Sequence, residues 1–347
     1  MSRTYQGSFI TKSPITPAGP YQCGAASGVW TIDQMVGWQK AGLWPVAGNL
    51  NEATVGIFAL GANGSFVATT TRDKYTFSGC VNSSATAASV ASYGGSAAGN
   101  ATIGIFALGC SSGLSTTRNK YTYSSCSNGT ATAASAASYT GAASGNSTIG
   151  IFALGAVTSG PPSSTRNKYT YSGDTSVVAT SATTGSSSQS ASGSSTVGIF
   201  ALGCVNVCQG STTRNKYTYS GDTNGSATAA SYVTYAGSAA GNSTTGIFNL
   251  GNRPYPYNQT TFRDKYTYSG CTVTSGTNAT ARGSYGSATG NSTTGIFAIG
   301  YNACISGPST TRNKYTYSGC SNASATAASI ASNEGSAVSN GIPGVNR

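Results

Sequence analysis

The sequence predicts an all-β protein, a six-bladed β-propeller with repeats of about 48 residues, preceded by a short helix-containing segment. Three observations support this prediction. The hexapeptide GIFALG or a close variant begins at residues 56, 104, 150, 198, 246 and 295, so successive copies are 46 to 49 residues apart. A decapeptide of the type TTRNKYTYSG follows each copy. Gly, Ser, Thr, Ala and Asn fill most remaining positions, and this composition favours strands and tight turns over helices.

Each repeat offers about four strands, the content of one propeller blade. GIFALG is apolar on both alternating faces, as expected of a strand between neighbouring sheets. RNKYTYSG alternates instead, so Arg118 and Lys120 are expected on one face and Tyr121 and Tyr123 on the other. The small-residue segment ATAAS is expected where the sheets converge on an axis, with one further short strand before it.

The two ends of the repeat region predict a closed ring. The first repeat begins at GIFALG without an ATAAS strand of its own, whereas the last ends with a surplus copy, residues 325–329. If this C-terminal strand joins the first GIFALG strand, the first blade is completed and no lateral sheet edge remains. The predicted domains are an anchor or linker segment, residues 1–50, and the propeller, residues 51–347.

The net charge of +11 belongs to the repeats, because 12 of the 18 Lys and Arg residues lie in the decapeptides. No dense basic run occurs, which argues against a nucleic-acid partner. The N-terminus has no continuous apolar signal region, and no segment approaches about 18 uninterrupted apolar residues, so no membrane span is expected.

The basic residues of the decapeptides have two interpretations. A ring of cations would meet anionic glycans or phosphate-rich surfaces, with nearby tyrosines stacking on sugar rings. The favoured alternative is structural: the side chains lie along the strands, cover neighbouring blades and bond loop carbonyls. The ring consists of Arg72, Lys74, Arg118, Lys120, Arg166, Lys168, Arg214, Lys216, Arg263, Lys265, Arg312 and Lys314.

The nine cysteines give no strong metal signal. Four of them share a repeat position where two other copies carry aspartate, which is typical of a surface turn; these residues are Cys80, Cys126, Cys271, Cys320, Asp174 and Asp222. Cys204 and Cys208 would either close a small loop or remain free thiols. The chain has no His, and neither a metal nor a cofactor is expected.

The segment before the repeats carries all three tryptophans, Trp30, Trp38 and Trp44. Thr31 and Gln34 read as a capping box, so a helix of about ten residues should begin there and end near Gly42. A helix this short is marginal alone and must dock on something. The tryptophans either plug one face of the propeller or belong to an anchor for another protein, and the two roles are compatible.

The loops after each GIFALG differ between copies and occupy equivalent positions, so they should cluster on one face as binding loops do. NRPYPYNQTTF is the most distinctive, because it brings cationic and aromatic groups to one loop. A proline-stiffened connection is the alternative interpretation of this loop. The candidate ligand-binding residues are Arg253, Tyr255, Tyr257 and Tyr301.

Catalysis is not predicted. The seven acids are scattered over the repeats, and no pair has the spacing that a glycosidase requires. Without His the usual general base is absent.

The order of small-residue strand, turn, apolar strand ending in glycine and KYTY resembles kelch-like repeats over residues 50–341. The wording TRNKYTYSG with GNSTIGIFALG is similar to kelch-like or RCC1-like repeat proteins of tailed bacteriophages. SGVWTIDQMVGWQKAGLWP resembles a short element of phage virion structural proteins, often beside a fibre or appendage domain.

This resemblance implies a non-enzymatic virion structural protein of a tail fibre, neck or capsid appendage that displays a propeller for attachment. Its expected partners are other virion structural proteins, contacted through residues 1–50, and host-surface glycans. The expected location is the virion. The alternative is a cellular glycan-binding or adhesion protein.

Overall fold

The structure is a computed structural model and describes residues 30–40, 53–158, 161–205, 209–254 and 259–341. The chain divides into two compact units, Met1–Asn51 with Arg347, and Glu52–Asn346. The sequence-based division lies between residues 50 and 51. No helix within the described ranges is long and apolar enough to cross a membrane.

The described part of the first unit contains the helix α1, Ile32–Lys40. Its capping box is confirmed: the Thr31 amide donates to Gln34 Oε1 at 2.9 Å, and the Gln34 amide donates to Thr31 Oγ1 at 3.2 Å. These two bonds satisfy backbone donors that the first turn of a helix leaves without partners.

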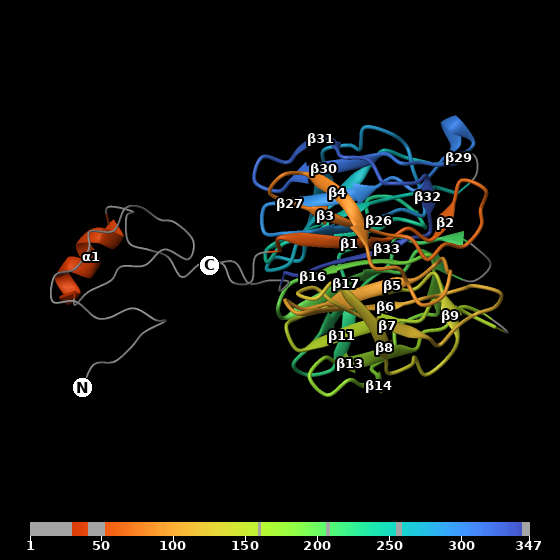
Figure 1. Ribbon diagram of the computed structural model, residues 1–347, viewed down its shortest axis with the longest axis horizontal. Coiled ribbons are helices and arrows are strands. Elements are labelled where there is room, and N and C mark those ends of the chain that lie inside the picture. Colours follow the sequence, from red (N-terminus) through yellow and green to blue (C-terminus); the bar gives the residue numbers. More distant parts are fainter. Residues whose placement is uncertain (1–29, 41–52, 159–160, 206–208, 255–258, 342–347) are drawn as a thin grey trace. The chain divides into compact units, whose positions relative to one another are not determined.

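The second unit is all-β. Its described residues contain six antiparallel sheets of four strands each, which we number 1 to 6 (Figure 1). In spatial order, sheet 1 contains β33 (Ser336–Ser339), β1 (Val55–Ala59), β3 (Arg72–Thr76) and β4 (Val81–Ala85). Sheet 2 contains β5 (Ser96–Gly99), β6 (Ile103–Ala107), β7 (Arg118–Thr122) and β8 (Ser127–Ala131). Sheet 3 contains β10 (Ala142–Gly145), β11 (Ile149–Ala153), β13 (Arg166–Thr170) and β14 (Thr175–Ala179).

The remaining three sheets have the same order. Sheet 4 contains β16 (Ser190–Gly193), β17 (Val197–Ala201), β20 (Arg214–Thr218) and β21 (Thr223–Ala227). Sheet 5 contains β22 (Ser238–Gly241), β23 (Thr245–Asn249), β24 (Arg263–Thr267) and β25 (Thr272–Gly276). Sheet 6 contains β26 (Ser287–Gly290), β27 (Thr294–Ala298), β30 (Arg312–Thr316) and β31 (Ser321–Ala325).

The register confirms two of the predicted strands. GIFALG supplies the second strand of each sheet and RNKYT the third; in sheet 2, Ala107 pairs with both Arg118 and Ser96. The short strand expected before ATAAS is the fourth, for example β8.

The prediction for ATAAS itself is wrong. Only its first alanine belongs to a strand, as Ala131 does in β8, and the first strand is a different small-residue segment, such as β5. The first strands must be built from small residues because little space separates them. A Cβ on Gly104, beside β5, would lie 2.7 Å from Cγ1 of Val338 in β33, so this region accepts Gly, Ala and Ser but few larger residues.

The strand that joins β1 is also not the surplus ATAAS copy. β33 pairs antiparallel with β1, for example Ile57 with Val338, whereas Ala325 ends β31 in sheet 6. The first strands contact one another in sequence, β33 with β5, β5 with β10, and so on through β16, β22 and β26, which contacts β33.

The core lies between the sheets. Ile57 and Val338 of sheet 1 form one cluster with Phe106 and Tyr121 of sheet 2. We call each boundary between two neighbouring sheets a seam, and equivalent clusters fill the other seams. Both faces of GIFALG are buried, as predicted for a strand between neighbouring sheets.

Short elements connect the sheets at one end, on the right of Figure 1. They are β2 (Ala62–Asn63), β9 (Ser138–Tyr139), β12 (Ala156–Val157), β15 (Ser186–Ser187), β18 (Cys204–Val205), β19 (Gln209–Gly210), β28 (Tyr301–Asn302), η1 (Ala303–Ile305), β29 (Gly307–Pro308) and β32 (Ser332–Asn333). Because β5 and β6 are antiparallel, the residues before β5 and the loop after β6 lie at the same end. We call this end of the unit, formed by the variable loops and the segments before the first strands, the loop face.

Candidate functional site

The six arginines of the predicted cationic ring are buried and are therefore not available to a surface ligand. Each is at most 2% exposed, and each guanidinium carbon lies 4.4 to 4.6 Å above a phenylalanine ring of the next sheet, as Arg72 does above Phe106. Burial lowers the pKa of Arg72 to about 10. The glycan-binding interpretation is thus wrong for these arginines.

The arginines instead join neighbouring sheets through side-chain hydrogen bonds. Arg72 Nη2 donates to Asn119 Oδ1 of sheet 2 at 3.2 Å, and its Nη1 donates to Asn128 Oδ1 at 2.8 Å. The structural interpretation is correct in that these arginines contact the neighbouring sheet. The main acceptors, however, are Asn and Asp side chains and not loop carbonyls. Loop carbonyls take part at a few positions, such as Ala229 O, which accepts from Arg214 at 3.5 Å.

The lysines of the ring lie half-buried at the same seams. Lys120 Nζ is 2.9 Å from Asp174 Oδ2, and Lys168 Nζ is 3.3 Å from Asp222 Oδ2. At three other seams the acceptor is the cysteine thiol, as in the 3.3 Å contact between Lys265 and Cys320.

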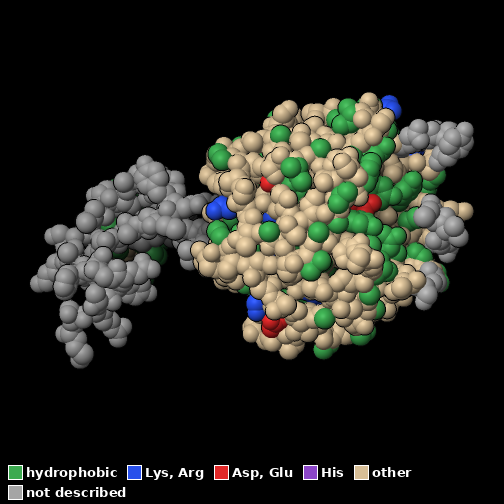
Figure 2. All heavy atoms as spheres, turned by 45° about the vertical axis from the view of Figure 1, so that its right-hand side comes forward, with side chains coloured by type: hydrophobic (Ala, Val, Ile, Leu, Met, Phe, Trp, Pro, Cys, Tyr) green, Lys and Arg blue, Asp and Glu red, His purple; other side chains and the backbone are tan. Residues whose placement is uncertain are grey.

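The turn predicted for the shared Cys and Asp position is confirmed, but it is part of the seam. All six residues have a left-handed backbone, with φ between 45° and 50°. The threonine of the preceding ATAAS segment donates to the carbonyl of this turn in the next sheet, for example Thr86 to Cys126 and Thr326 to Cys80. The repeated polar residues therefore hold the frame together, and few Lys and Arg side chains show on the visible surface in Figure 2.

Exposed aromatic side chains mark the loop face, where hydrophobic side chains are numerous on the right of Figure 2. Phe66, from the loop after β1, is 55% exposed, and its ring centroid lies 6.0 Å from that of Tyr301, from the loop after β27. The neighbouring Val67 and Ile305 are exposed as well. Tyr301, a candidate from the sequence, is therefore placed beside an aromatic residue that the sequence analysis did not single out.

A second aromatic group lies in the segment before β22 and the loop between β23 and β24. The ring of Tyr232, which is 40% exposed, stacks on Phe262 with centroids 5.0 Å apart. The guanidinium carbon of Arg253, another candidate from the sequence, lies 4.7 Å from the centroid of Tyr232. The other two candidates in this loop, Tyr255 and Tyr257, lie outside the described residues.

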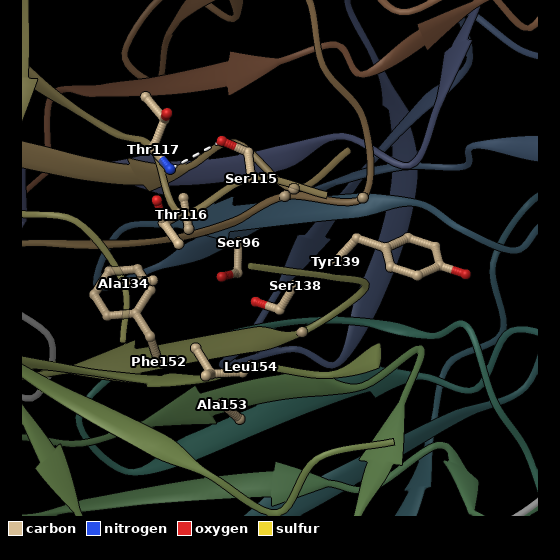
Figure 3. A pocket seen from close by; sticks show the side chains of 15 residues that line it. Ser96, Ser115, Thr116, Thr117, Ala134, Ser138, Tyr139, Phe152, Ala153 and Leu154 are labelled. Carbon is tan, nitrogen blue, oxygen red and sulfur yellow. Dashed lines mark hydrogen bonds between the residues drawn. The ribbon is translucent and has the colours of Figure 1, made fainter. Parts of the chain in front are cut away.

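Narrow crevices open between neighbouring sheets at the loop face. The one between sheets 2 and 3 is lined by Ser96, Ser138, Tyr139 and Phe152, among others, and small hydroxyl side chains line its walls (Figure 3). Its Ser115 accepts a hydrogen bond from the Thr117 amide at 2.9 Å (Figure 3). Equivalent crevices recur at other seams, so they follow from the repeat.

A further cavity, open to solvent, lies where the segments before the six first strands meet. Each sheet contributes two successive residues to its lining. The first of each pair has a left-handed backbone with φ between 50° and 64°, and these residues are Gly94, Thr140, Ser188, Ala236, Tyr285 and Glu334. The second residues are Gly95, Gly141, Gln189, Gly237, Gly286 and Gly335. We call this space the axial cavity.

Backbone hydrogen bonds link the lining segments from sheet to sheet. The Gly94 amide donates to Glu334 O at 2.8 Å, the Thr140 amide to Gly94 O at 2.6 Å, and the Tyr285 amide to Ala236 O at 2.8 Å. Sequence reasoning missed this cavity, although the repeat alignment carries a signal: one aligned position holds six different residues.

No group of three or more potential metal ligands occurs among the residues that the structure describes. The described acids of the sheets have separate roles. Asp73 and Asp264 are buried against arginines, and Asp174 and Asp222 accept from lysines. Glu334 lines the axial cavity.

Two of the proposed anchor tryptophans fall in the described part of the first unit. Trp30 precedes α1 and Trp38 lies within it, and both are partly exposed. Trp44 lies outside the described residues.

Comparisons with known proteins address the fold only. No protein-family model matches the sequence, and no curated protein matches it. The chain is similar to a solved structure described as "Structure of YjhT", with a TM-score of 0.56 and 11% identity. The match covers 71% of this chain and 87% of that one. It supports a propeller-like all-β architecture.

Proposed function

We propose that residues 51–347 form a closed six-bladed propeller that serves, without catalysis, as a virion structural protein of a tailed phage. Its loop face attaches to a host surface or glycan, and residues 1–50 attach the protein to other virion proteins. The observation that carries the proposal is a separation of roles. The repeated polar residues form hydrogen bonds between neighbouring sheets, whereas exposed aromatic residues gather at the loop face.

The six-bladed arrangement is supported by contacts between the last sheet and the first. Arg312 Nη2 donates to Asp73 Oδ2 at 2.8 Å, as Arg72 does to Asn119. β33 pairs with β1, and the first strands contact one another from β33 through to β26 and back. A ring of this kind leaves no lateral edge for pairing with other chains.

The attachment role is supported by the chemistry of the loop face. Phe66 with Tyr301, and Tyr232 with Arg253, offer rings and a cation at the surface. Aromatic side chains stack on the apolar faces of sugar rings and are enriched in recognition surfaces.

Display of the loop face is supported by the position of the chain ends. Asn340 Oδ1 accepts hydrogen bonds from the amides of Thr54 and Val55 at 2.9 Å, so the two ends of the described β unit meet opposite the loop face.

The attachment test compares loop-face variants with a matched surface control. Phe66→Ala with Tyr301→Ala, and separately Tyr232→Ala, should reduce adsorption of purified protein to host cells about tenfold or more, as loss of aromatic anchors does in other interfaces. Val178→Ala is the control, because Val178 is 63% exposed on the outer strand β14. Equal adsorption of all variants would refute loop-face attachment.

The virion role is tested by immunogold electron microscopy of the source material with an antibody against the propeller. Labelling of fibre tips, necks or capsids supports it, and labelling of cells alone would replace it with the cellular adhesion alternative.

The anchor role is tested by truncation. Removal of residues 1–45 should abolish incorporation into particles while the propeller stays folded. Normal incorporation of the truncated protein would refute the anchor role.

A further inference from the structure

The axial cavity breaks the repeat in a way that the frame does not require. The positions that join neighbouring sheets repeat closely, as the six buried arginines do. The first lining position holds Gly, Thr, Ser, Ala, Tyr and Glu in the six sheets. A symmetric frame thus encloses an asymmetric space.

Gln189 is the most informative departure. The other five sheets have glycine at its position, and a Cβ added to any of these glycines would lie 2.0 to 2.4 Å from a backbone carbonyl oxygen of the next strand, for example Gly141 against Ala153 O. A side chain at this position therefore requires the backbone to shift, which costs stability. Sheet 4 shows an altered pattern: the Gln189 amide, and not that of Ser188, bonds to Thr140 O, at 3.3 Å.

The Gln189 side chain is 93% buried and half-satisfied. Its Nε2 donates to Ser186 O at 2.8 Å, whereas its Oε1 is buried without a hydrogen-bond partner. An unpartnered buried acceptor costs about 1 to 3 kcal/mol. A departure that costs stability and supplies an unused acceptor is typical of a binding position.

Glu334 supplies a second unused acceptor to the same cavity. Its Oε2 is buried without a hydrogen-bond partner, and burial raises the pKa of the carboxyl above its ordinary value. Tyr285 lies in the neighbouring lining segment, and its backbone oxygen accepts a hydrogen bond from the Glu334 amide at 2.7 Å. None of the residues that line the cavity is Lys or Arg, so no protein cation balances the carboxylate there.

We propose that the axial cavity binds a small molecule carrying a protonated amine, with Glu334 Oε2 and Gln189 Oε1 as acceptors and the Tyr285 ring beside it. The cavity is open to solvent, so its enclosed part takes the ammonium group and the rest of the molecule lies at the opening. An ammonium group donates up to three hydrogen bonds and neutralises the buried carboxylate, whereas an anion adds to its charge.

The test titrates three sugars of equal size into the full chain and follows binding by calorimetry and by protein NMR. Glucosamine should bind saturably, glucose at least about tenfold more weakly, and glucuronate not at all, because a charge-assisted bond is roughly twice as strong as a neutral one. Ethanolamine tests the amine without the sugar ring. Equal affinity for glucosamine and glucose, or no binding of either amine, would overturn the proposal.

Two variants test the acceptors with little risk of misfolding, because each makes a small change that the fold tolerates. Gln189→Gly restores the residue of the five other sheets, and Glu334→Gln removes only the charge. Each should weaken glucosamine binding about tenfold or more while the melting temperature holds or rises, since Gln189→Gly removes a buried unpartnered acceptor and Glu334→Gln removes a buried charge. Unchanged affinity in Glu334→Gln would refute the role of the carboxylate.

The axial cavity is distinct from the aromatic residues proposed for attachment, although both lie at the loop face. Phe66→Ala should leave glucosamine affinity unchanged, and Gln189→Gly should leave adsorption to cells unchanged. Loss of both properties in either variant would show that the two sites are one and would overturn the axial site as stated.

Discussion

The guanidinium Nη2 of Arg312 lies 2.8 Å from Oδ2 of Asp73, and both side chains are fully buried. This contact joins sheet 6 to sheet 1, although 239 residues separate the two in sequence. Arg214 and Asp264 form the same ion pair between sheets 4 and 5, while other seams pair arginine with asparagine. The geometry is shared, and only the charge of the acceptor differs.

Removing one partner of this buried pair should be far more harmful than neutralising the other. Arg312→Met leaves Asp73 as an uncompensated buried charge, at a cost of about 3 to 5 kcal/mol. Asp73→Asn installs the residue that sheet 2 carries at the equivalent position, Asn119, and should lower the free energy of unfolding by only about 1 kcal/mol. Urea denaturation followed by tyrosine fluorescence measures both. Equal losses for the two variants would contradict the structural equivalence of the seams.

A methyl group on Gly109 should destabilise the second unit. The residue has φ of 76°, and an added Cβ would lie 2.3 Å from Tyr93 O. Backbone strain and overpacking together predict a loss of about 2 kcal/mol or more for Gly109→Ala. Gly113→Ala is the matched control in the same loop, because nothing lies within 4 Å of its added Cβ. Its effect should stay within about 0.5 kcal/mol, and thermal melts that do not separate the two variants would count against the loop geometry.

Stability should fall in acid because of two turn carboxylates. Burial alone would raise the pKa of Asp174, but hydrogen bonds from the Tyr169 hydroxyl, the Thr132 amide and Lys120 hold it well below its ordinary value. The pKa of Asp222 is lowered by equivalent bonds. The stabilisation is therefore complete above the unfolded pKa near 3.8 and is lost as the pH falls below it.

The matched variant for this prediction comes from the repeat itself. Asp174→Cys with Asp222→Cys installs the residue of the other four sheets and should lose less stability than the unaltered chain between pH 6 and about pH 3, because a thiol does not titrate there. Denaturation midpoints at the two pH values provide the measurement. An identical acid response in both proteins would rule out these carboxylates as its source.

The sequence predicted the frame well because period and alternation are local signals. GIFALG and RNKYT occupy the second and third strands, and the capping box of Thr31 and Gln34 forms. The error on ATAAS arose because two segments of each repeat consist of small residues. Only the packing against Val338 and its equivalents shows which of them must be small.

The candidate site was predicted only in part. Tyr301 and Arg253 lie in exposed loops, but their partners Phe66 and Tyr232 come from segments distant in sequence, and no local pattern pairs them. The axial residues escaped notice because each is unremarkable alone. Gln189 becomes informative once the five aligned glycines are known to abut backbone carbonyls.

The seams also have a direction. At every one the earlier sheet supplies the arginine and the later sheet the asparagine or aspartate, and Arg312 with Asp73 continues the pattern. Each sheet is thus a donor on one side and an acceptor on the other. A fragment with fewer repeats exposes an arginine side at one end and an asparagine or aspartate side at the other. Two such complementary surfaces on one molecule favour head-to-tail association. For the closed ring proposed above, joining the two ends of one chain competes during synthesis with linking the ends of different copies, and dilution favours the first.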